Sequence, residues 1–133
     1  MPAPSTHALG YVLVVDDDLD AREMLLTLLL DEGYHAVAAE DGLEALHLLR
    51  TVRHHAPDTA CLVLLDLRMP RLGGGEFRRA QLSDPVLANV PVAVMSGAVD
   101  AEAHAQALGA VAVLPKPIDV DALLRVVGQH CGR

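Results

Sequence analysis

Residues Val12 to Glu23 read VLVVDDDLDARE and carry the strongest signal of the fold. Four apolar residues, three of them valines, run directly into Asp16, Asp17 and Asp18, and a helical pattern begins immediately afterwards. A strand that is apolar throughout and leads into a helix is typical of a parallel sheet covered on both faces. Like charges a few ångströms apart repel by about 1 kcal/mol even in water. The three adjacent carboxylates therefore need a counter-charge.

The same alternation of strand and helix signals occurs five times along the chain. Gly33 and Gly109 stop two of the helices, and Asp119 is placed to cap the last one. The expected strands are residues 11–15, 35–39, 61–65, 91–95 and 111–114, and the expected helices are residues 20–32, 41–53, 76–82, 100–108 and 120–127. This pattern predicts an α/β fold of the (βα)5 doubly wound type, with a five-stranded parallel sheet and helices on both faces.

Length and composition indicate one ordinary domain. The 133 residues can form a single core, and 52% of them are hydrophobic. We expect residues 1–10 to form a poorly ordered N-terminal extension and residues 11–130 to form a single domain. The net charge of −8 disfavours binding to nucleic acid or to an anionic membrane surface. No apolar run approaches the roughly 18 residues that span a bilayer, and the first ten residues do not resemble a secretory signal.

The two cysteines, Cys61 and Cys131, form no CxxC pair. Cys61 lies in the most apolar of the strand candidates, so we expect a buried core thiol there. A free thiol fits a reducing compartment, and the expected location is cytoplasmic. With no Trp, two Tyr and one Phe, the chain offers no platform on which nucleic-acid bases could stack.

Polar side chains stand where the expected strands end. Asp16 and Asp17 follow the first strand, Asp66 the third, Ser96 the fourth and Lys116 the fifth. In a doubly wound sheet, ligands bind beyond these carboxyl ends, at the point where the strand order reverses. A few carboxylate oxygens suit Mg²⁺, which keeps several waters and is commonly completed by a phosphate oxygen. A hydroxyl and an ammonium beside the metal suit a phosphoryl group. The cluster therefore predicts a site for Mg²⁺ and a phosphoryl group.

Each of these residues also has an ordinary structural interpretation. Asp18 is best explained as a first-turn helix acid, but one helix start cannot use three caps. Asp66 alone is an ordinary strand-end residue, Ser96 with Gly97 forms a turn, and Lys116 is a solvated lysine. The coincidence of these residues at four strand ends, in order, favours a site. The seven histidines show no ligand spacing, which disfavours zinc.

The motifs VLVVDDD, LLDLRMP, VMSGA and LPKP, in this order and spacing, resemble the receiver domain of two-component response regulators, of the chemotaxis-regulator type. The resemblance covers the chain from Tyr11 to Gly128 and implies a flavodoxin-like fold. It also implies that Asp66 accepts a phosphoryl group from a partner histidine kinase or histidine phosphotransfer protein. Such a domain catalyses only its own phosphorylation and dephosphorylation, is no turnover enzyme on a small substrate, and signals by protein–protein contact or phosphoryl relay.

The resemblance assigns a role to each residue of the cluster. In the family, Ser96 would hydrogen-bond the acyl phosphate and Lys116 would form an ion pair with it. The bond between Lys116 and Pro117 is usually cis in the family, which would aim the amine into the pocket. The implied Mg²⁺ ligands are Asp16, Asp17, Asp66 and the main-chain carbonyl of Arg68.

Two positions depart from the family's usual pattern. Val113 stands where the family often carries Tyr or Phe, so the aromatic flip that couples phosphorylation to the far face is unavailable in its usual form. Arg68 stands two residues after the implied phosphoacceptor, where its side chain can overhang the site. It could shield the phosphoryl group from water or pair with Asp17 or with nearby Glu residues, and the sequence does not choose between these roles.

Other functions are open alternatives. An aspartate-nucleophile phosphatase of the dehalogenase type needs a second acid two residues after the nucleophile, where Arg68 stands. A pseudo-receiver would bind partners without phosphorylation, and the presence of all five site residues argues against it. A flavodoxin-like cofactor binder would need a phosphate loop after the first strand, which is missing. The sequence names no downstream partner, and it fits both a stand-alone receiver and an excised domain.

Overall fold

The structure is a computed structural model and describes residues 10–51, 60–68 and 73–132. The expected extension at residues 1–10, except for Gly10, and the expected end of the second helix near residue 53 therefore lie outside the described residues. Among the helices of the described part, none is long and apolar enough to cross a membrane.

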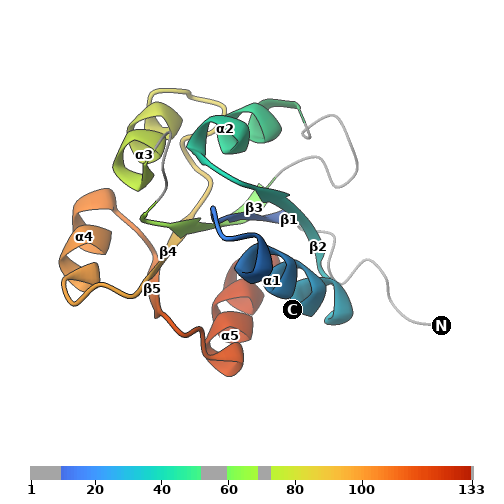
Figure 1. The fold of residues 1–133 in the computed structure, drawn as a ribbon. Coiled ribbons are helices and arrows are strands. Elements are labelled where there is room, and N and C mark those ends of the chain that lie inside the picture. The colour runs from blue at the N-terminus through green and yellow to red at the C-terminus, as the bar shows by residue number, and fades with distance from the viewer. Residues whose placement is uncertain (1–9, 52–59, 69–72, 133) are drawn as a thin grey trace.

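Five parallel strands form one sheet in the order β2-β1-β3-β4-β5 (Figure 1). The strands are β1 (Tyr11–Val15), β2 (His35–Ala39), β3 (Ala60–Asp66), β4 (Val92–Ser96) and β5 (Ala112–Pro115). The helices are α1 (Leu19–Asp31), α2 (Gly42–Thr51), α3 (Gly74–Leu82), α4 (Ala101–Leu108) and α5 (Val120–Cys131). The predicted doubly wound α/β architecture is confirmed.

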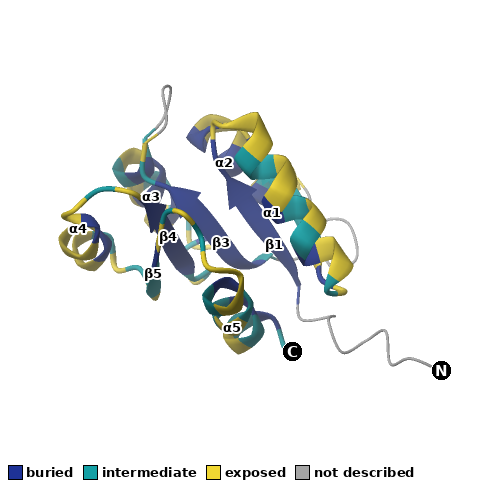
Figure 2. Cartoon of the chain, turned by 60° about the horizontal axis from the view of Figure 1, so that its bottom comes forward, coloured by how far each residue is buried: buried dark blue, intermediate teal, exposed yellow. Residues whose placement is uncertain are grey.

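Helices cover both faces of the sheet (Figure 1). On one face, α1 and α5 contribute Leu25 and Leu123 to the same apolar cluster as Val12. On the other face, α2 and α3 contribute Leu46 and Phe77 to a second cluster. Helix α4 packs beside β4 and β5. The sheet therefore lies between two helical layers, as Figure 2 shows by the buried strands and the exposed outer side of α1.

Strand β1 explains the apolar run at the start of the chain, because all of its residues are buried. Val12 and Val14 point to the face covered by α1 and α5, and Leu13 and Val15 point to the face covered by α2 and α3. Successive side chains of a strand alternate between its two faces. Since both faces are covered, every position has to be apolar until the strand ends.

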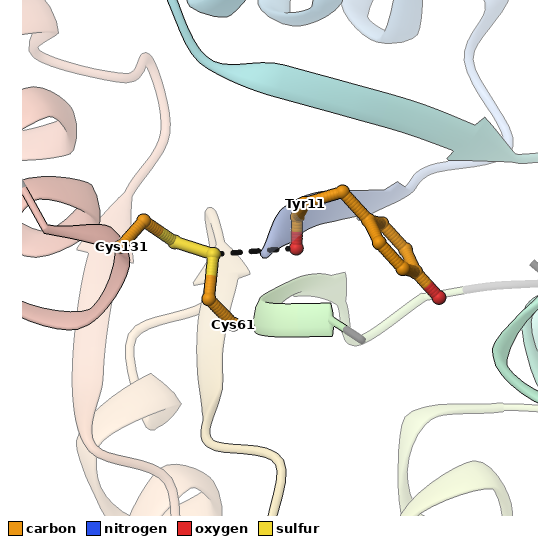
Figure 3. The surroundings of a disulfide bond; sticks show 3 residues. All are labelled: Tyr11, Cys61 and Cys131. Carbon is orange, nitrogen blue, oxygen red and sulfur yellow. Dashed lines mark hydrogen bonds between the residues drawn. A yellow bond between two sulfur atoms is a disulfide. The ribbon is translucent and has the colours of Figure 1, made fainter. Parts of the chain in front are cut away.

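The prediction of a free core thiol at Cys61 is wrong. Cys61 is buried, as expected, but its sulfur forms a disulfide with Cys131 (Figure 3). The described residues contain no free cysteine. The last turn of α5 brings Cys131 to the start of β3, 70 residues away in the sequence, and no local pattern could indicate that approach.

Several helix boundaries differ from the expectation. Helix α5 continues to Cys131, beyond the expected residue 127, and places Val127 and Cys131 in the core. Asp119 stands at the N-cap position as predicted, but its side chain makes no capping hydrogen bond. Helix α3 begins at Gly74, before the expected residue 76, and the main-chain N–H of Gly73 donates to Glu76 Oε1 at 3.1 Å. Helix ends are the least predictable part of a helix because the apolar periodicity does not define them.

Candidate functional site

The strand order places the polar strand ends at one edge of the sheet. Strands β1 and β3 are neighbours at its centre, and the chain continues from β1 to β2 on one side and from β3 to β4 on the other. This is the reversal of strand order beside which doubly wound folds bind ligands. Because all strands are parallel, Asp16, Asp66, Ser96 and Lys116 meet at this edge, as the sequence predicted.

The three neighbouring carboxylates of the opening motif divide into two structural roles. Asp18 is the N-cap of α1, and its Oδ1 accepts a hydrogen bond from the N–H of Asp20 at 3.1 Å, as predicted. Asp16 and Asp17 instead join Asp66, with one oxygen of each carboxylate within 4.8 Å of the others. Asp16 and Asp66 are buried, and Asp17 is exposed. The N–H of Asp18 donates to Asp16 Oδ1 at 2.9 Å and fixes that side chain.

Lys116 supplies the positive charge at the cluster. Its Nζ lies 3.3 Å from Asp16 Oδ2 and 3.4 Å from Asp66 Oδ2. Burial alone would lower the pKa of Lys116, but the attraction of Asp66 and Asp16 outweighs it and raises the pKa. The bond from Lys116 to Pro117 is cis, as the family resemblance implied. One cation therefore bridges two buried carboxylates and remains charged.

Burial raises the pKa of Asp66 from 3.8 to about 6. The charge of Asp16 contributes to this increase, whereas the N–H of Arg68, which donates to Asp66 Oδ1 at 3.2 Å, and the ammonium of Lys116 partly offset it. The raised pKa shows that one lysine does not fully compensate the cost of burying this carboxylate beside Asp16. At neutral pH the group is still mostly ionised, which a nucleophile requires.

A cleft of about 350 Å³ opens over these groups. Ser96 is buried at its wall, and its Oγ accepts a hydrogen bond from the N–H of Ala98 at 3.0 Å. That bond leaves the hydroxyl hydrogen to be donated to a ligand in the cleft. The residues that line the cleft are Asp17, Asp66, Arg68, Ser96, Gly97 and Lys116.

The donor set of the cluster fits a hard divalent cation. Three carboxylates offer oxygen only, and oxygen ligands in small number suit Mg²⁺. The exposed position of Asp17 leaves room for the waters that Mg²⁺ retains. Arg68 lines the cleft, and the predicted use of its main-chain carbonyl as a ligand stays a prediction.

Sequence reasoning missed one residue that supports the site. The side chain of Arg22, one turn into α1, donates from Nη1 to the main-chain carbonyl of Asp16 at 2.9 Å. This bond ties α1 to the end of β1 and so holds the acidic motif against the helix. An Arg at this position also fits an exposed helical residue, so the sequence gives no signal of the contact.

A comparison with protein families gives a match to the response regulator receiver domain over residues 12–128. The chain is 40% identical over 113 residues to a response regulator receiver protein of Anaeromyxobacter sp. strain Fw109-5, covering 84% of this chain and 44% of that protein. It is 33% identical to sporulation initiation phosphotransferase F of Bacillus subtilis, covering 90% of this chain and 91% of that protein. The chain thus spans less than half the length of the first of these relatives and nearly all of the second.

Solved structures agree with these relationships. A response regulator receiver protein from Pseudomonas putida superposes with a TM-score of 0.79 at 33% identity, covering 90% of this chain and 96% of that one. The chemotaxis response regulator CheY4 of Vibrio cholerae superposes with a TM-score of 0.78 at 29% identity, covering 90% of this chain and 97% of that one.

Proposed function

The chain belongs to the receiver domains of two-component response regulators, and we propose that Asp66 is its phosphoacceptor. The observation that carries the proposal is the convergence of Asp66, Asp16, Asp17 and Lys116 around one cleft. The donor is a phosphohistidine on a histidine kinase or a histidine phosphotransfer protein. The relative named sporulation initiation phosphotransferase F, which is matched over nearly its whole length, supports a role in phosphoryl transfer.

The proposed reaction is a nucleophilic displacement at phosphorus. An oxygen of the Asp66 carboxylate attacks the phosphoryl group, the new O–P bond forms, and the P–N bond to the donor histidine breaks with its electron pair going to the imidazole. Asp66 must be ionised to attack, and a pKa of about 6 allows this at neutral pH. A bound Mg²⁺ would supply positive charge to the transferred oxygens, held by Asp16, Asp17, Asp66 and the main-chain carbonyl of Arg68.

The remaining residues stabilise the product. Lys116 lies 3.4 Å from Asp66 Oδ2 and can follow the negative charge as it moves onto the phosphoryl oxygens. Ser96 can donate its hydroxyl hydrogen to one of those oxygens. Loss of the phosphoryl group to water then returns the carboxylate. The domain thus acts on itself and turns over no small substrate.

The proposal extends to organisation and setting. Residues 11–130 act as one receiver domain in the cytoplasm, where histidine kinases present their phosphohistidine. Output occurs through protein–protein contact or onward phosphoryl relay, and not through nucleic acid or membrane binding by this domain. The net charge of −8 agrees with that choice, since it repels both polyanions.

Intact-mass measurement after incubation with acetyl phosphate and Mg²⁺ tests the proposal. The wild type should gain about one phosphoryl group, and Asp66→Asn should gain none. Asp18→Asn is the matched control, because it removes a neighbouring carboxylate but retains a good N-cap, and it should be modified like the wild type. Modification of Asp66→Asn to the wild-type extent would place the acceptor elsewhere.

A further inference from the structure

The disulfide and the acidic cluster lie at opposite ends of the same strand. Cys61 is the second residue of β3 and Asp66 is the last. At about 3.3 Å per residue, the two are roughly 16 Å apart. The partner, Cys131, lies in the last turn of α5. The bond therefore fastens the end of α5 to the start of β3, far from the cleft.

An irregularity of the sheet aims Cys61 at α5. Leu62 and Leu64 point to the face covered by α1 and α5, so regular alternation would send Cys61 to the opposite face. The pairing of β1 with β3 shifts register between Tyr11 and Val12, which leaves Cys61 as an extra residue in β3. Extra residues of this kind re-aim a side chain. Cys61 accordingly joins the apolar cluster that contains Cys131.

The surroundings also suit the reduced state of the pair. Cys61 Sγ lies 3.3 Å from the main-chain carbonyl oxygen of Tyr11, a contact drawn in Figure 3. A disulfide sulfur carries no hydrogen, so in the oxidised protein this contact is no hydrogen bond, whereas a Cys61 thiol could donate one there. The pair is otherwise packed among apolar side chains, which accept a small thiol well. The carbonyl oxygen of Tyr11 is thus in place to accept a hydrogen bond from the Cys61 thiol that reduction produces.

We propose that Cys61 and Cys131 form a reversible thiol–disulfide site that sets the order of the last turn of α5 and the stability of the domain. Its oxidant is a low-molecular-weight disulfide of the glutathione class. In the exchange, the two cysteine thiols are oxidised to one protein disulfide, and the small disulfide is reduced to two thiols that receive the two hydrogens. In a reducing compartment the pair is a dithiol, and oxidative stress closes it.

Access to the site runs through the end of α5. Both cysteines are buried, with exposed fractions of 8% for Cys61 and 0% for Cys131, so a small thiol or disulfide reaches them only after local opening. The helix ends one residue later, at the left-handed Gly132, and helix ends open at low cost in free energy. In the reduced protein, where the bond no longer holds this turn, its fraying exposes Cys131 to the small disulfide while the sheet stays intact.

Reduction should loosen α5 at its last turn only. The start of α5 stays bound to the rest of the domain, because Leu123 is buried in the core and the main-chain N–H of Lys116 donates to the carbonyl oxygen of Ser96 at 3.0 Å. The cleft therefore keeps its geometry in both states. The site is a second input to the domain, separate from Asp66 and independent of its phosphorylation.

Equilibration of the wild-type protein in glutathione buffers of stepped redox ratio tests the proposal. Alkylation of free thiols followed by intact-mass measurement should show full and reversible conversion between disulfide and dithiol, with the far-ultraviolet circular dichroism of a folded protein in both states. The melting temperature should fall by on the order of 10 °C on reduction. Amide ¹⁵N order parameters near Cys131 should fall from about 0.85 toward about 0.6, while the amide shifts of residues 15–17 and 66–68 stay in place.

Cys131→Ala is the matched variant, since it cannot form the bond and removes only one sulfur from the core. Its order parameters in α5 should equal those of the reduced wild type, its melting temperature should lie at or slightly below that of the reduced wild type because the lost sulfur is buried, and neither should respond to the redox ratio. The proposal is overturned if the pair stays oxidised in the most reducing buffer, if no disulfide forms in the most oxidising one, or if the reduced protein unfolds. It is equally overturned if reduction moves the amide shifts at the cleft as far as those at Cys131.

Discussion

The substitution Asp66→Asn should stabilise the metal-free protein, and the gain should grow with pH. Asparagine has the same shape as aspartate, and its side-chain oxygen can still accept the hydrogen bond that Arg68 N–H gives to Asp66 Oδ1 at 3.2 Å. What the variant loses is a carboxylate whose ionisation the fold disfavours, because burial raises its pKa to about 6. Lys116 keeps its second partner, Asp16, at 3.3 Å.

The magnitude follows from the pKa. The difference between about 6 in the folded protein and 3.8 in the unfolded chain corresponds to about 3 kcal/mol. Because the folded pKa is the higher one, the folded protein binds more protons than the unfolded chain between these pH values. The contribution of Asp66 to stability is therefore fully present below pH 3.8 and is lost as the pH rises through about 6. Asp66→Asn lacks this loss, so its stability relative to the wild type should rise by about 2 kcal/mol from pH 4.5 to pH 7.5.

Urea unfolding followed by circular dichroism, in a chelator and at pH 4.5, 5.5 and 7.5, measures this difference. Asp18→Asn serves as the control, because this residue is an exposed cap that asparagine replaces well, and its difference from the wild type should stay within about 0.5 kcal/mol. A difference between Asp66→Asn and the wild type that is constant with pH, or that falls as the pH rises, would show that burial of the Asp66 carboxylate does not destabilise the fold.

Three further predictions concern the metal, the core and the output. Millimolar Mg²⁺ should raise the melting temperature of the wild type because it binds only the folded state. Without metal, Asp17→Asn should melt at a higher temperature than the wild type and should gain less from Mg²⁺, whereas a lower metal-free melting temperature would point to a capping role of Asp17. Arg78→Ala should lower the free energy of unfolding by about 2–3 kcal/mol in urea melts, because the nearly buried guanidinium donates at 2.8 Å to the carbonyl oxygen of Leu108 and at 2.8 Å to the buried Gln81. The exposed Arg79→Ala should change the free energy of unfolding little, and an equal loss in both variants would contradict this prediction. Beryllofluoride with Mg²⁺ should shift amide resonances mainly in the loops after β1, β3 and β4, because the short, stiff side chain of Val113 cannot fill the space that a moving Ser96 vacates. Large shifts throughout β5 and α5 would show that Val113 does not prevent coupling between the site and these elements.

The site residues could be placed from the sequence because a parallel sheet sends all its carboxyl ends to one edge. Asp16 and Asp66 stand at the ends of apolar runs, and Lys116 follows another such run. Once these runs are parallel strands in the order β1-β3-β4-β5, the three residues have to lie close together. The role of Asp18 could also be predicted, because the start of a helix uses one cap, and Asp18 is the cap of α1 in the structure. The roles of these residues in phosphoryl transfer rest on the family and stay predictions.

The disulfide could not be predicted, because it depends on the register of two strands. Alternation from Leu62 places Cys61 on the wrong face of the sheet, and only the shift between Tyr11 and Val12 corrects it. The approach of Cys131 needs the additional turn of α5 that the apolar pattern did not mark. Both features arise from packing between distant segments and not from the local sequence.

The buried hydrogen-bond network of Arg78 and Gln81 on α3 could not be predicted from the sequence for a related reason. Arg78 and Arg79 are adjacent and chemically identical, yet the first is 9% exposed and the second is exposed. Arg78 lies where α3 meets the end of α4, and Gln81 beside it donates to the carbonyl oxygens of Leu87 and Val90 at 3.0 and 2.8 Å. Only the contact of the Arg78 side chain with the end of α4 distinguishes the two arginines.

The role of Asp66 as the phosphoacceptor is best tested by mapping the phosphoryl group to a single residue. The wild-type protein is incubated with acetyl phosphate and Mg²⁺, treated with borohydride, which reduces an acyl phosphate to an alcohol, and analysed by peptide mass spectrometry. We expect conversion of Asp66 to homoserine, dependent on the phosphodonor and absent when Mg²⁺ is chelated. Conversion of Asp16 or Asp17 instead, or an unmodified Asp66 under conditions in which the protein is folded and loaded with Mg²⁺, would contradict this role of Asp66.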